Sequence, residues 1–161
     1  MRKSLAFLFL IAFVLLSGCL KDPIQEDILN YVNSELSQAH KLEKKAVTAY
    51  ESVTGANFTN DQALYDALQN EVIPTYKQFL QELKAVKIET EELEKIHDIY
   101  IKAAETQLEA FEVIIQALEN QNPVLINQAN DMLEQGRNQI SDYQKKLDNL
   151  AQEHNVNLEK E

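Results

Sequence analysis

The sequence predicts an all-α fold, arranged as an antiparallel up-down-up-down four-helix bundle. Apolar residues recur in steps of three and four along most of the chain, which is the spacing of one helix face. Only three glycines and three prolines occur among 161 residues, so few turns are expected. Short gaps separate four such segments and favour antiparallel neighbours. The alternative architecture is an open pair of helical hairpins that dimerises.

The first helix is predicted over about 23–54. Asp22 can accept hydrogen bonds from the free N–H groups of the first turn, so it is the expected N-cap. Pro23 follows it, and proline fits the first helical position because its missing donor is not needed there. Gly55 is expected to end this helix, since glycine readily adopts the left-handed conformation of a C-terminal stop.

The second helix is predicted over about 60–86. The residues Thr59-Asn60-Asp61-Gln62 match a capping box, with Thr59 as N-cap and Gln62 reaching back to it. Pro74 lies inside this helix and removes one backbone donor. A kink is therefore expected near residues 70–73.

The third and fourth helices are predicted over about 91–119 and 123–154. The third opens with Glu91, Glu92 and Glu94, whose charges favour the positive end of the helix dipole. The fourth opens at Asn122-Pro123, again a cap followed by a proline. The polar residues 155–161 are expected to be a frayed tail.

Residues 1–18 have the composition of a cleaved export signal. Arg2 and Lys3 precede an unbroken apolar run of 12 residues from Leu5 to Leu16. A helix needs about 20 apolar residues to span a bilayer. The run is too short for a permanent span and has the length of a signal-peptide core.

The stretch Leu16-Ser17-Gly18-Cys19 contains the only cysteine of the chain and resembles the lipobox of bacterial lipoproteins. The resemblance implies a diacylglyceryl group on the Cys19 sulfur and cleavage between Gly18 and Cys19. It also implies N-acylation of the new terminus, for example with palmitate. Residues 19–22 would then be a lipidated cysteine and a very short tether. The alternative is an ordinary secretory signal with a chance cysteine.

The resemblance implies a lipid-anchored protein at the extracytoplasmic face of the cell membrane. The lysine-rich basic composition favours a Gram-positive type of envelope, although Leu20 after the cysteine would also permit outer-membrane sorting. With so short a tether, the loop at 87–90 and the C-terminus should face the bilayer. The loops at 55–59 and 119–122 should face outward.

The formal charge of the chain is −11, and removal of residues 1–18 takes away two cations and no acid. A nucleic-acid partner is excluded, because such a partner requires clustered positive charge. Anionic lipid headgroups would also repel this surface. The acyl chains are therefore expected to hold the protein to the bilayer, and no other cofactor is expected.

His97 lies on the apolar stripe of the third helix, and a buried imidazole needs hydrogen-bond partners. Counting residues from the helix ends places Tyr143 or Tyr31 at the same depth, so we expect His97 to contact one of them. Glu94 stands three residues before His97, but the pair occurs once, and a di-metal bundle needs two. No metal site is predicted.

The same counting places Ala39, Pro74, Ala104 and Gly136 in one layer. Glycine within a helix costs about 1 kcal/mol relative to alanine, so a compensating feature is expected. Either the helices approach closely at this layer, or a cavity opens near Pro74 and Gly136. A cavity could hold a small apolar ligand.

Phe58 lies on the polar outer tip between the first two helices. It is either an exposed docking contact or a hydrophobic staple that packs near Ala63 or Leu64.

These features favour a non-enzymatic binding module whose partner is an unknown envelope or membrane protein, as a monomer or homodimer. The alternatives are a small apolar ligand carrier and, with less support, a hydrolase or metal-dependent enzyme. No catalytic residue is predicted.

Overall fold

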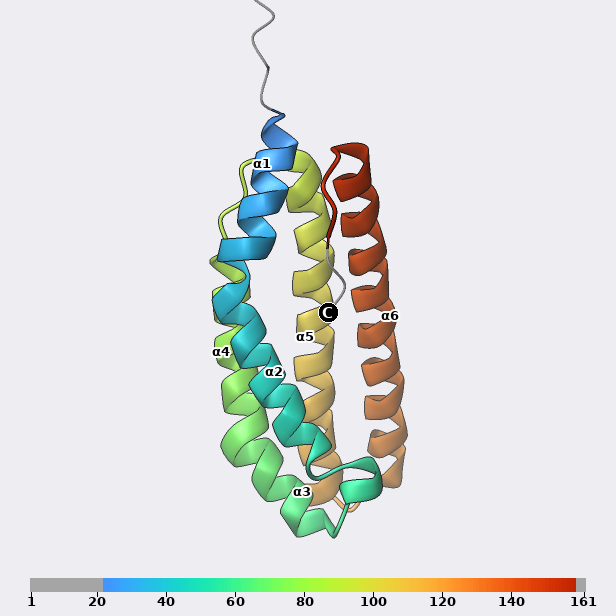
Figure 1. The fold of residues 1–161 in the computed structure, drawn as a ribbon. Helices are drawn as coiled ribbons and strands as arrows, with labels where there is room; N and C mark the ends of the chain where they lie inside the picture. Colours follow the sequence, from blue (N-terminus) through green and yellow to red (C-terminus); the bar gives the residue numbers. More distant parts are fainter. Residues whose placement is uncertain (1–21, 159–161) are drawn as a thin grey trace, which may run out of the picture.

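The computed structural model describes residues 22–158, and these are all-α, with no strand among them (Figure 1). The predicted signal peptide, Gly18 and Cys19 lie outside the described residues. The helical elements in chain order are α1 (Pro23–Asn30), η1 (Tyr31–Glu35), α2 (Ser37–Glu51), η2 (Gly55–Asn57), α3 (Asp61–Ala67), η3 (Leu68–Val72), α4 (Ile73–Lys84), α5 (Glu91–Glu119) and α6 (Pro123–Glu153). None of these helices combines the length and apolarity needed to cross a membrane.

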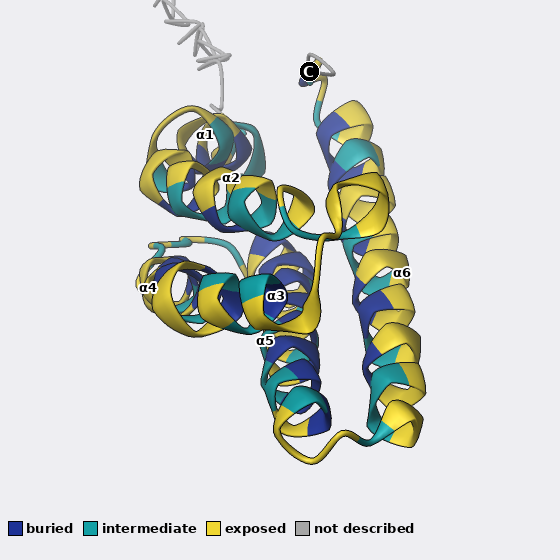
Figure 2. Ribbon diagram, turned by 90° about the horizontal axis from the view of Figure 1, so that it is seen from below, coloured by how far each residue is buried: buried dark blue, intermediate teal, exposed yellow. Residues whose placement is uncertain are grey.

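The elements form two layers of paired segments. The run α1–η1–α2 lies beside the returning run α3–η3–α4, and α5 lies beside α6 (Figures 1 and 2). The faces that these segments turn toward one another are buried, and the outer faces of α2, α3 and α6 are largely exposed (Figure 2). The largest fully buried side chains include Tyr31, Tyr76 and Phe79, so aromatic rings fill much of the space between the layers.

The first predicted helix is interrupted rather than continuous. In η1 the Leu36 N–H donates to the Tyr31 carbonyl at 3.0 Å, which is the five-residue spacing of a π turn. A π turn inserts one extra residue into a helix, and such insertions are frequent at functional sites. The helix also ends earlier than predicted, at Glu51, because the Thr54 hydroxyl donates to the Tyr50 carbonyl at 2.8 Å. Gly55, with φ +57°, begins η2 instead of ending α2.

The second π segment, η3, directly precedes Pro74, where the sequence predicts a kink. The Ile73 N–H donates to the Leu68 carbonyl, and Pro74 has no N–H to donate. A proline ring also clashes with the carbonyl four residues before it. The wider π turn makes room for the ring, so the irregularity is located at residues 68–72.

The helix starts follow the predicted caps in two of three cases. The Asp22 carboxylate accepts from the Ile24 N–H at 3.0 Å, and the Asn122 side chain accepts from the Val124 N–H at 3.0 Å. The capping box at Thr59 is wrong. Asn60 is the N-cap of α3 and accepts from the Ala63 N–H at 2.9 Å. Asparagine caps slightly better than threonine, and the Gln62 side chain donates to Asp66 Oδ1 at 2.9 Å instead of reaching back to the cap.

The structure differs from the predicted frayed tail at Val156, which packs against the end of α6. Asn155 adopts φ +57°, and the Val156 N–H donates to the Ala151 carbonyl at 2.7 Å. This is a Schellman cap, in which the residue after the left-handed position packs on the helix. Val156 is accordingly only 5% exposed. Residues 159–161 lie outside the described part.

Contacts between distant segments define two ends of the molecule. The Asp22 end contains Asp22, residues 85–90 and His154, since His154 contacts Asp22 and residues 89–90 contact α1. The far end contains residues 52–60 and 120–122 (Figure 1).

Candidate functional site

A buried polar network joins α1–η1, α5 and α6. It consists of Tyr31, His97 and Tyr143. The Tyr31 hydroxyl lies 2.9 Å from His97 Nδ1 and 3.1 Å from the Tyr143 hydroxyl. Tyr31 is 0% exposed and His97 4% exposed. The sequence placed His97 near either tyrosine, and the structure brings all three side chains together.

The positions of the hydrogens in this network follow from one fixed acceptor. His97 Nε2 lies 3.0 Å from the Leu83 carbonyl, which can only accept, so Nε2 carries the proton in the neutral ring. Nδ1 then accepts from the Tyr31 hydroxyl, and the Tyr31 oxygen accepts from Tyr143. Burial lowers the pKa of His97, although the Leu83 carbonyl and nearby carboxylates partly oppose this shift. The neutral form of the ring is therefore favoured.

A partly buried carboxylate extends the network toward α2. The Tyr100 ring stacks on the Tyr143 ring with centroids 4.5 Å apart, and the Tyr100 hydroxyl donates to Glu43 Oε2 at 2.5 Å. Burial raises the pKa of Glu43, and the bond from Tyr100 opposes that shift. Burial also raises the pKa of Tyr143 to about 12. Glu43 was not identified from the sequence. Its position four residues after Ala39, which places both on one helix face, was the available signal.

The small-residue layer is closely packed at Gly136. A Cβ atom on Gly136 would lie 2.6 Å from the Gln107 Cγ of α5. Gln107 is itself held by the Tyr76 hydroxyl, which donates to Gln107 Oε1 at 2.6 Å. Of the two alternatives for this layer, the structure therefore shows close packing at Gly136 and no cavity there, because the Gln107 side chain occupies the space that the glycine leaves.

The other members of that predicted layer are divided between core and surface. Ala39 and Ala104 are fully buried, as close helix approach requires. Pro74 is exposed and faces outward from α4. It does not share a space with Gly136.

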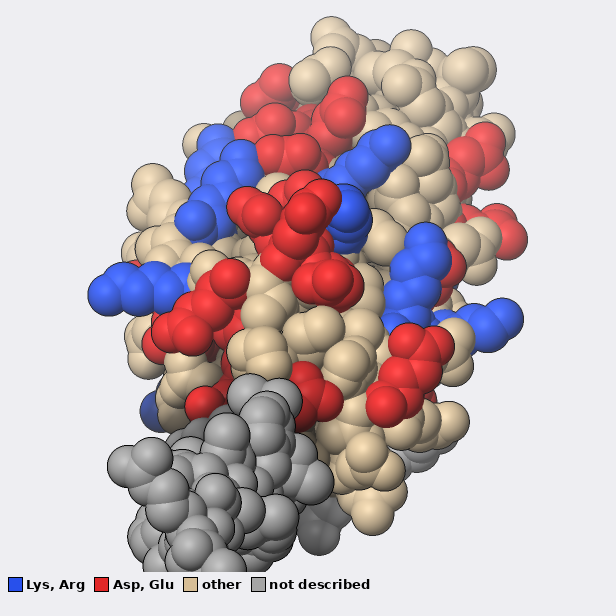
Figure 3. All heavy atoms as spheres, turned by 90° about the horizontal axis from the view of Figure 1, so that it is seen from above, with Lys and Arg blue, Asp and Glu red and all other residues tan. Residues whose placement is uncertain are grey.

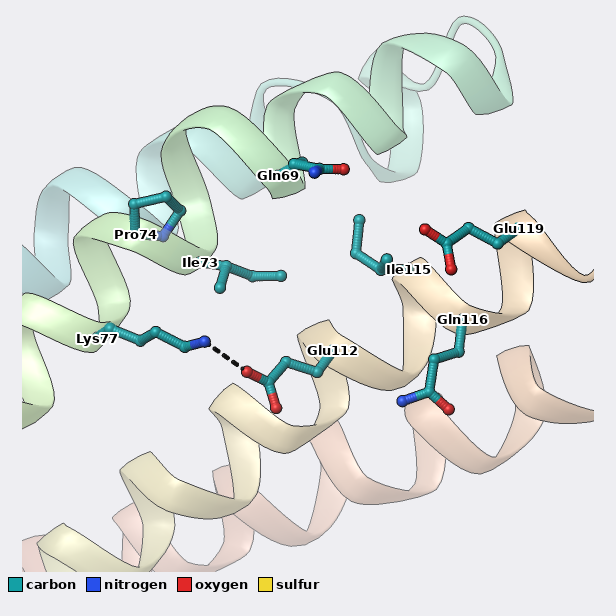
Figure 4. Close-up of a pocket in the computed structure, with 8 residues that line it drawn as sticks. All are labelled: Gln69, Ile73, Pro74, Lys77, Glu112, Ile115, Gln116 and Glu119. Carbon is teal, nitrogen blue, oxygen red and sulfur yellow. Dashed lines mark ion pairs between the residues drawn. The ribbon is translucent and has the colours of Figure 1, made fainter.

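Pro74 instead lines an open groove between the α3–η3–α4 run and α5, with a volume of about 560 Å³ (Figure 4). We call it the Pro74 groove. Ile73 and Ile115 project into it from opposite sides and form its apolar floor (Figure 4). Its lining residues are Gln69, Ile73, Pro74, Lys77, Glu112, Ile115, Gln116 and Glu119.

The Pro74 groove contains one lysine and two glutamates, and only one of the glutamates pairs with the lysine. Lys77 Nζ lies 2.8 Å from Glu112 Oε1, and both side chains are about half exposed. Glu119 Oε1 accepts from the Tyr65 hydroxyl at 3.0 Å. The lysine charge is thus offset within the groove, whereas the Glu119 charge meets a neutral hydroxyl.

Phe58 is 48% exposed at the far end, where Val124 is also exposed at 69%. The predicted staple placed Phe58 directly before the N-cap. Because Asn60 is the N-cap, the residue directly before the cap is Thr59 and not Phe58. The predicted staple, which needs Phe58 in that position, is therefore wrong. Phe58 is a partly exposed aromatic side chain on an uncharged tip.

Two further carboxylates hold the Asp22 end together. Asp27, 3% exposed, accepts at Oδ2 from the Glu89 N–H, the Thr90 N–H and the Thr90 hydroxyl, the last at 2.6 Å. Its Oδ1 atom is buried without a hydrogen-bond partner. Asp22 Oδ2 lies 2.6 Å from His154 Nδ1, and this bond lowers the pKa of Asp22. Neither role was identified from the sequence, since both partners lie far away along the chain.

The Glu94 and His97 side chains are not arranged to bind a metal ion. Both ring nitrogens of His97 are engaged, one by Tyr31 and one by Leu83, so Glu94 and His97 do not form a free ligand pair. Within residues 22–158 no cluster of three or more His, Cys, Asp or Glu side chains is placed to hold a metal ion.

Comparisons with protein-family models, with curated proteins and with solved structures give no match.

Proposed function

We propose that this chain is a lipid-anchored, non-enzymatic binding module at the extracytoplasmic face of the cell membrane. The observation that carries the proposal is the distance along the chain between Cys19 and the folded domain. Asp22 is already the N-cap of α1, so three peptide steps separate the cap from the cysteine. They span about 10 Å when extended. A lipid on Cys19 would therefore hold the domain at the bilayer surface.

The proposed anchor sets an orientation. The Asp22 end would face the bilayer and the far end would point outward. Figure 3 views the Asp22 end, and acidic and basic side chains are interspersed over the coloured residues of this face. Such a mixed surface offers anionic headgroups little net attraction, which supports anchoring by acyl chains.

We further propose that the four runs α1–η1–α2, α3–η3–α4, α5 and α6 act as the four antiparallel members of one helical bundle. Two polar side chains of its interior have hydrogen-bond partners within the fold: His97 bonds Tyr31 and Leu83, and Gln107 bonds Tyr76. This supports a structural role for the interior. The binding surface is then on the outside, where the Pro74 groove opens.

The anchor is tested by replacing the cysteine and following the protein in its native type of cell. Cys19→Ala should abolish incorporation of a clickable palmitate analogue and release the protein from the membrane fraction or leave an uncleaved precursor. Ser17→Ala is the matched control, because it keeps a small residue before the cleavage site. Labelling that persists in Cys19→Ala, or an unlabelled soluble wild-type protein, would refute the proposed anchor.

A further inference from the structure

The Pro74 groove has the shape of a site for one side chain and its neighbours. Ile73 of α4 and Ile115 of α5 are half-buried on its floor, and its exposed rim includes Gln69, Gln116 and Glu119. The rim residues are exposed, so the groove is open to solvent on that side. An enclosed pocket would suit a small molecule, which buries most of its surface. An open groove with an apolar floor suits a side chain presented by a peptide.

The irregular backbone beside Pro74 leaves the Gln69 carbonyl without its usual helical donor. The carbonyl of Gln69 would ordinarily accept from residue 73 in an α-helix or residue 74 in a π-helix. The Ile73 N–H donates to Leu68 instead, and Pro74 has no N–H. Gln69 lines the groove, so its carbonyl is a candidate acceptor for a donor on an incoming segment.

The charge of the groove selects the chemistry of that segment. Lys77 is neutralised by Glu112 at 2.8 Å, and Glu119 is left with a neutral partner, Tyr65. Glu119 lies two turns beyond Glu112 on α5, or about 10 Å along the axis. A cation placed beside Glu119 would reach a carboxylate that no lysine of the groove offsets. An anionic lipid or nucleic acid would be repelled.

We propose that the Pro74 groove binds a short basic segment of an envelope protein. An aliphatic side chain of that segment seats on Ile73 and Ile115, and an Arg or Lys one helical turn away pairs with Glu119. This inference takes the envelope as the source of the partner from the proposed function. The recognition chemistry depends only on the groove.

The first test is a titration of the mature protein in detergent micelles, followed by methyl NMR. The probe is a short capped peptide with Leu and Arg one helical turn apart. The methyl signals of Ile73 and Ile115 should shift, and those of Ile24 at the Asp22 end should not. The same peptide with Glu in place of Arg should cause no shift. Equal binding of the Glu peptide, or shifts that avoid Ile73 and Ile115, would overturn the proposal.

Variants of Glu119 then test whether this carboxylate pairs with the Arg of the peptide. Exposed ion pairs reach about 1 kcal/mol, so Glu119→Gln should weaken binding of the Arg peptide by up to about fivefold, and Glu119→Lys should weaken it further. The control is Glu153→Lys, a charge reversal at an exposed position of α6 outside the groove, which should change binding less than twofold. Unchanged affinity in Glu119→Lys, with an unchanged melting temperature, would exclude the assigned pairing.

The partner is tested in cells with a photo-crosslinking residue at Gln116, compared with one at Gln152 on α6. A crosslink from Gln116 to a segment with adjacent aliphatic and basic residues, lost in Glu119→Lys, supports the proposal. A crosslink to a second copy of this chain would identify a homodimer interface and overturn it. Peptide binding by the Cys19→Ala variant in solution separates the two ideas, because it reports on the groove whether or not the anchor exists.

Discussion

The Tyr31 hydroxyl donates to Nδ1 of His97 at 2.9 Å and thereby connects the first helical run to α5. Tyr31 is also the first residue of the π segment η1. The extra residue of that turn shifts the register of the residues that follow it, and Tyr31, at the start of the turn, is fully buried in the core. A local irregularity of the backbone and a long-range hydrogen bond therefore meet at one residue.

Removing the Tyr31 hydroxyl should destabilise the fold. Tyr31→Phe keeps the ring but leaves His97 Nδ1 and the Tyr143 hydroxyl without this partner. A buried group that loses its partner costs about 1–3 kcal/mol, so the free energy of unfolding in urea should fall by that amount. Tyr65→Phe is the control, because its hydroxyl is exposed, and it should leave the unfolding curve nearly unchanged. Equal curves for wild type and Tyr31→Phe would show that the network is energetically silent.

Acid should destabilise the protein through His97. Burial lowers the pKa of His97 below the ordinary value of 6.5, so the unfolded chain binds this proton more readily than the folded one. The stabilising contribution is present in full above about pH 6.5 and is lost as the pH falls toward the folded pKa. Protonation would also force Nδ1 to donate to Tyr31 and so reverse the hydrogen-bond chain.

This acid dependence is isolated by His97→Gln, because an amide can still accept from Tyr31 and donate to Leu83. Urea unfolding of both proteins should be compared between about pH 7.5 and about pH 5. The difference in the free energy of unfolding between the wild type and His97→Gln should become smaller as the pH falls. The raised pKa of Glu43 acts in the opposite direction, since its contribution is lost as the pH rises, and it is common to both proteins. A constant difference would argue against a lowered His97 pKa.

Alanine at Gly136 should destabilise the fold despite its better helix propensity. The new Cβ would lie 2.6 Å from Gln107 Cγ, and overpacking in a core typically costs about 1–3 kcal/mol. Most of this range exceeds the gain of about 1 kcal/mol from replacing glycine. The net loss should be up to about 2 kcal/mol in urea unfolding. In a Gln107→Ala background, Gly136→Ala should instead raise the free energy of unfolding. If it still lowers the free energy of unfolding there, the clash of the new Cβ is not with the Gln107 side chain.

Asp27 should be required to hold the loop before α5. Asp27→Ala removes the acceptor of the Glu89 and Thr90 N–H groups, and the loss of buried bonds of this kind costs about 1–3 kcal/mol. Hydrogen exchange at these two amides should accelerate. The control is Glu35→Ala, which removes a more exposed bond to the neighbouring Lys87 N–H. It should leave exchange at Glu89 and Thr90 unchanged.

The positions of α5 and α6 could be predicted from the sequence because their signals are local. Glu91, Asn122 and Pro123 mark their starts, and a sustained apolar stripe predicts their buried face. The contact of His97 with Tyr31 could also be anticipated, since residues at equal depth in packed helices meet.

The features that could not be predicted have two kinds of cause. Either two adjacent residues fit the same role, or the residues in contact lie far apart in the sequence. Thr59 and Asn60 both fit a cap, and the geometry of the turn selects Asn60. The π turn at Tyr31 contains no proline that would signal it. Asp27 resembles any surface acid until the fold brings Thr90 to it. At the chain end, Asn155 followed by Val156 was a readable Schellman signal that the surrounding polar residues obscured.

The contact between Asp22 and His154 brings the two described ends of the chain together, which makes the domain a candidate for circular permutation. A short linker could join the ends, and new termini could be opened in the turn at residues 120–122, at the opposite end. An acylated cysteine attached there would invert the domain on the bilayer. The Pro74 groove, which reaches Glu119 at the end of α5 next to the far end, would then lie closer to the lipid.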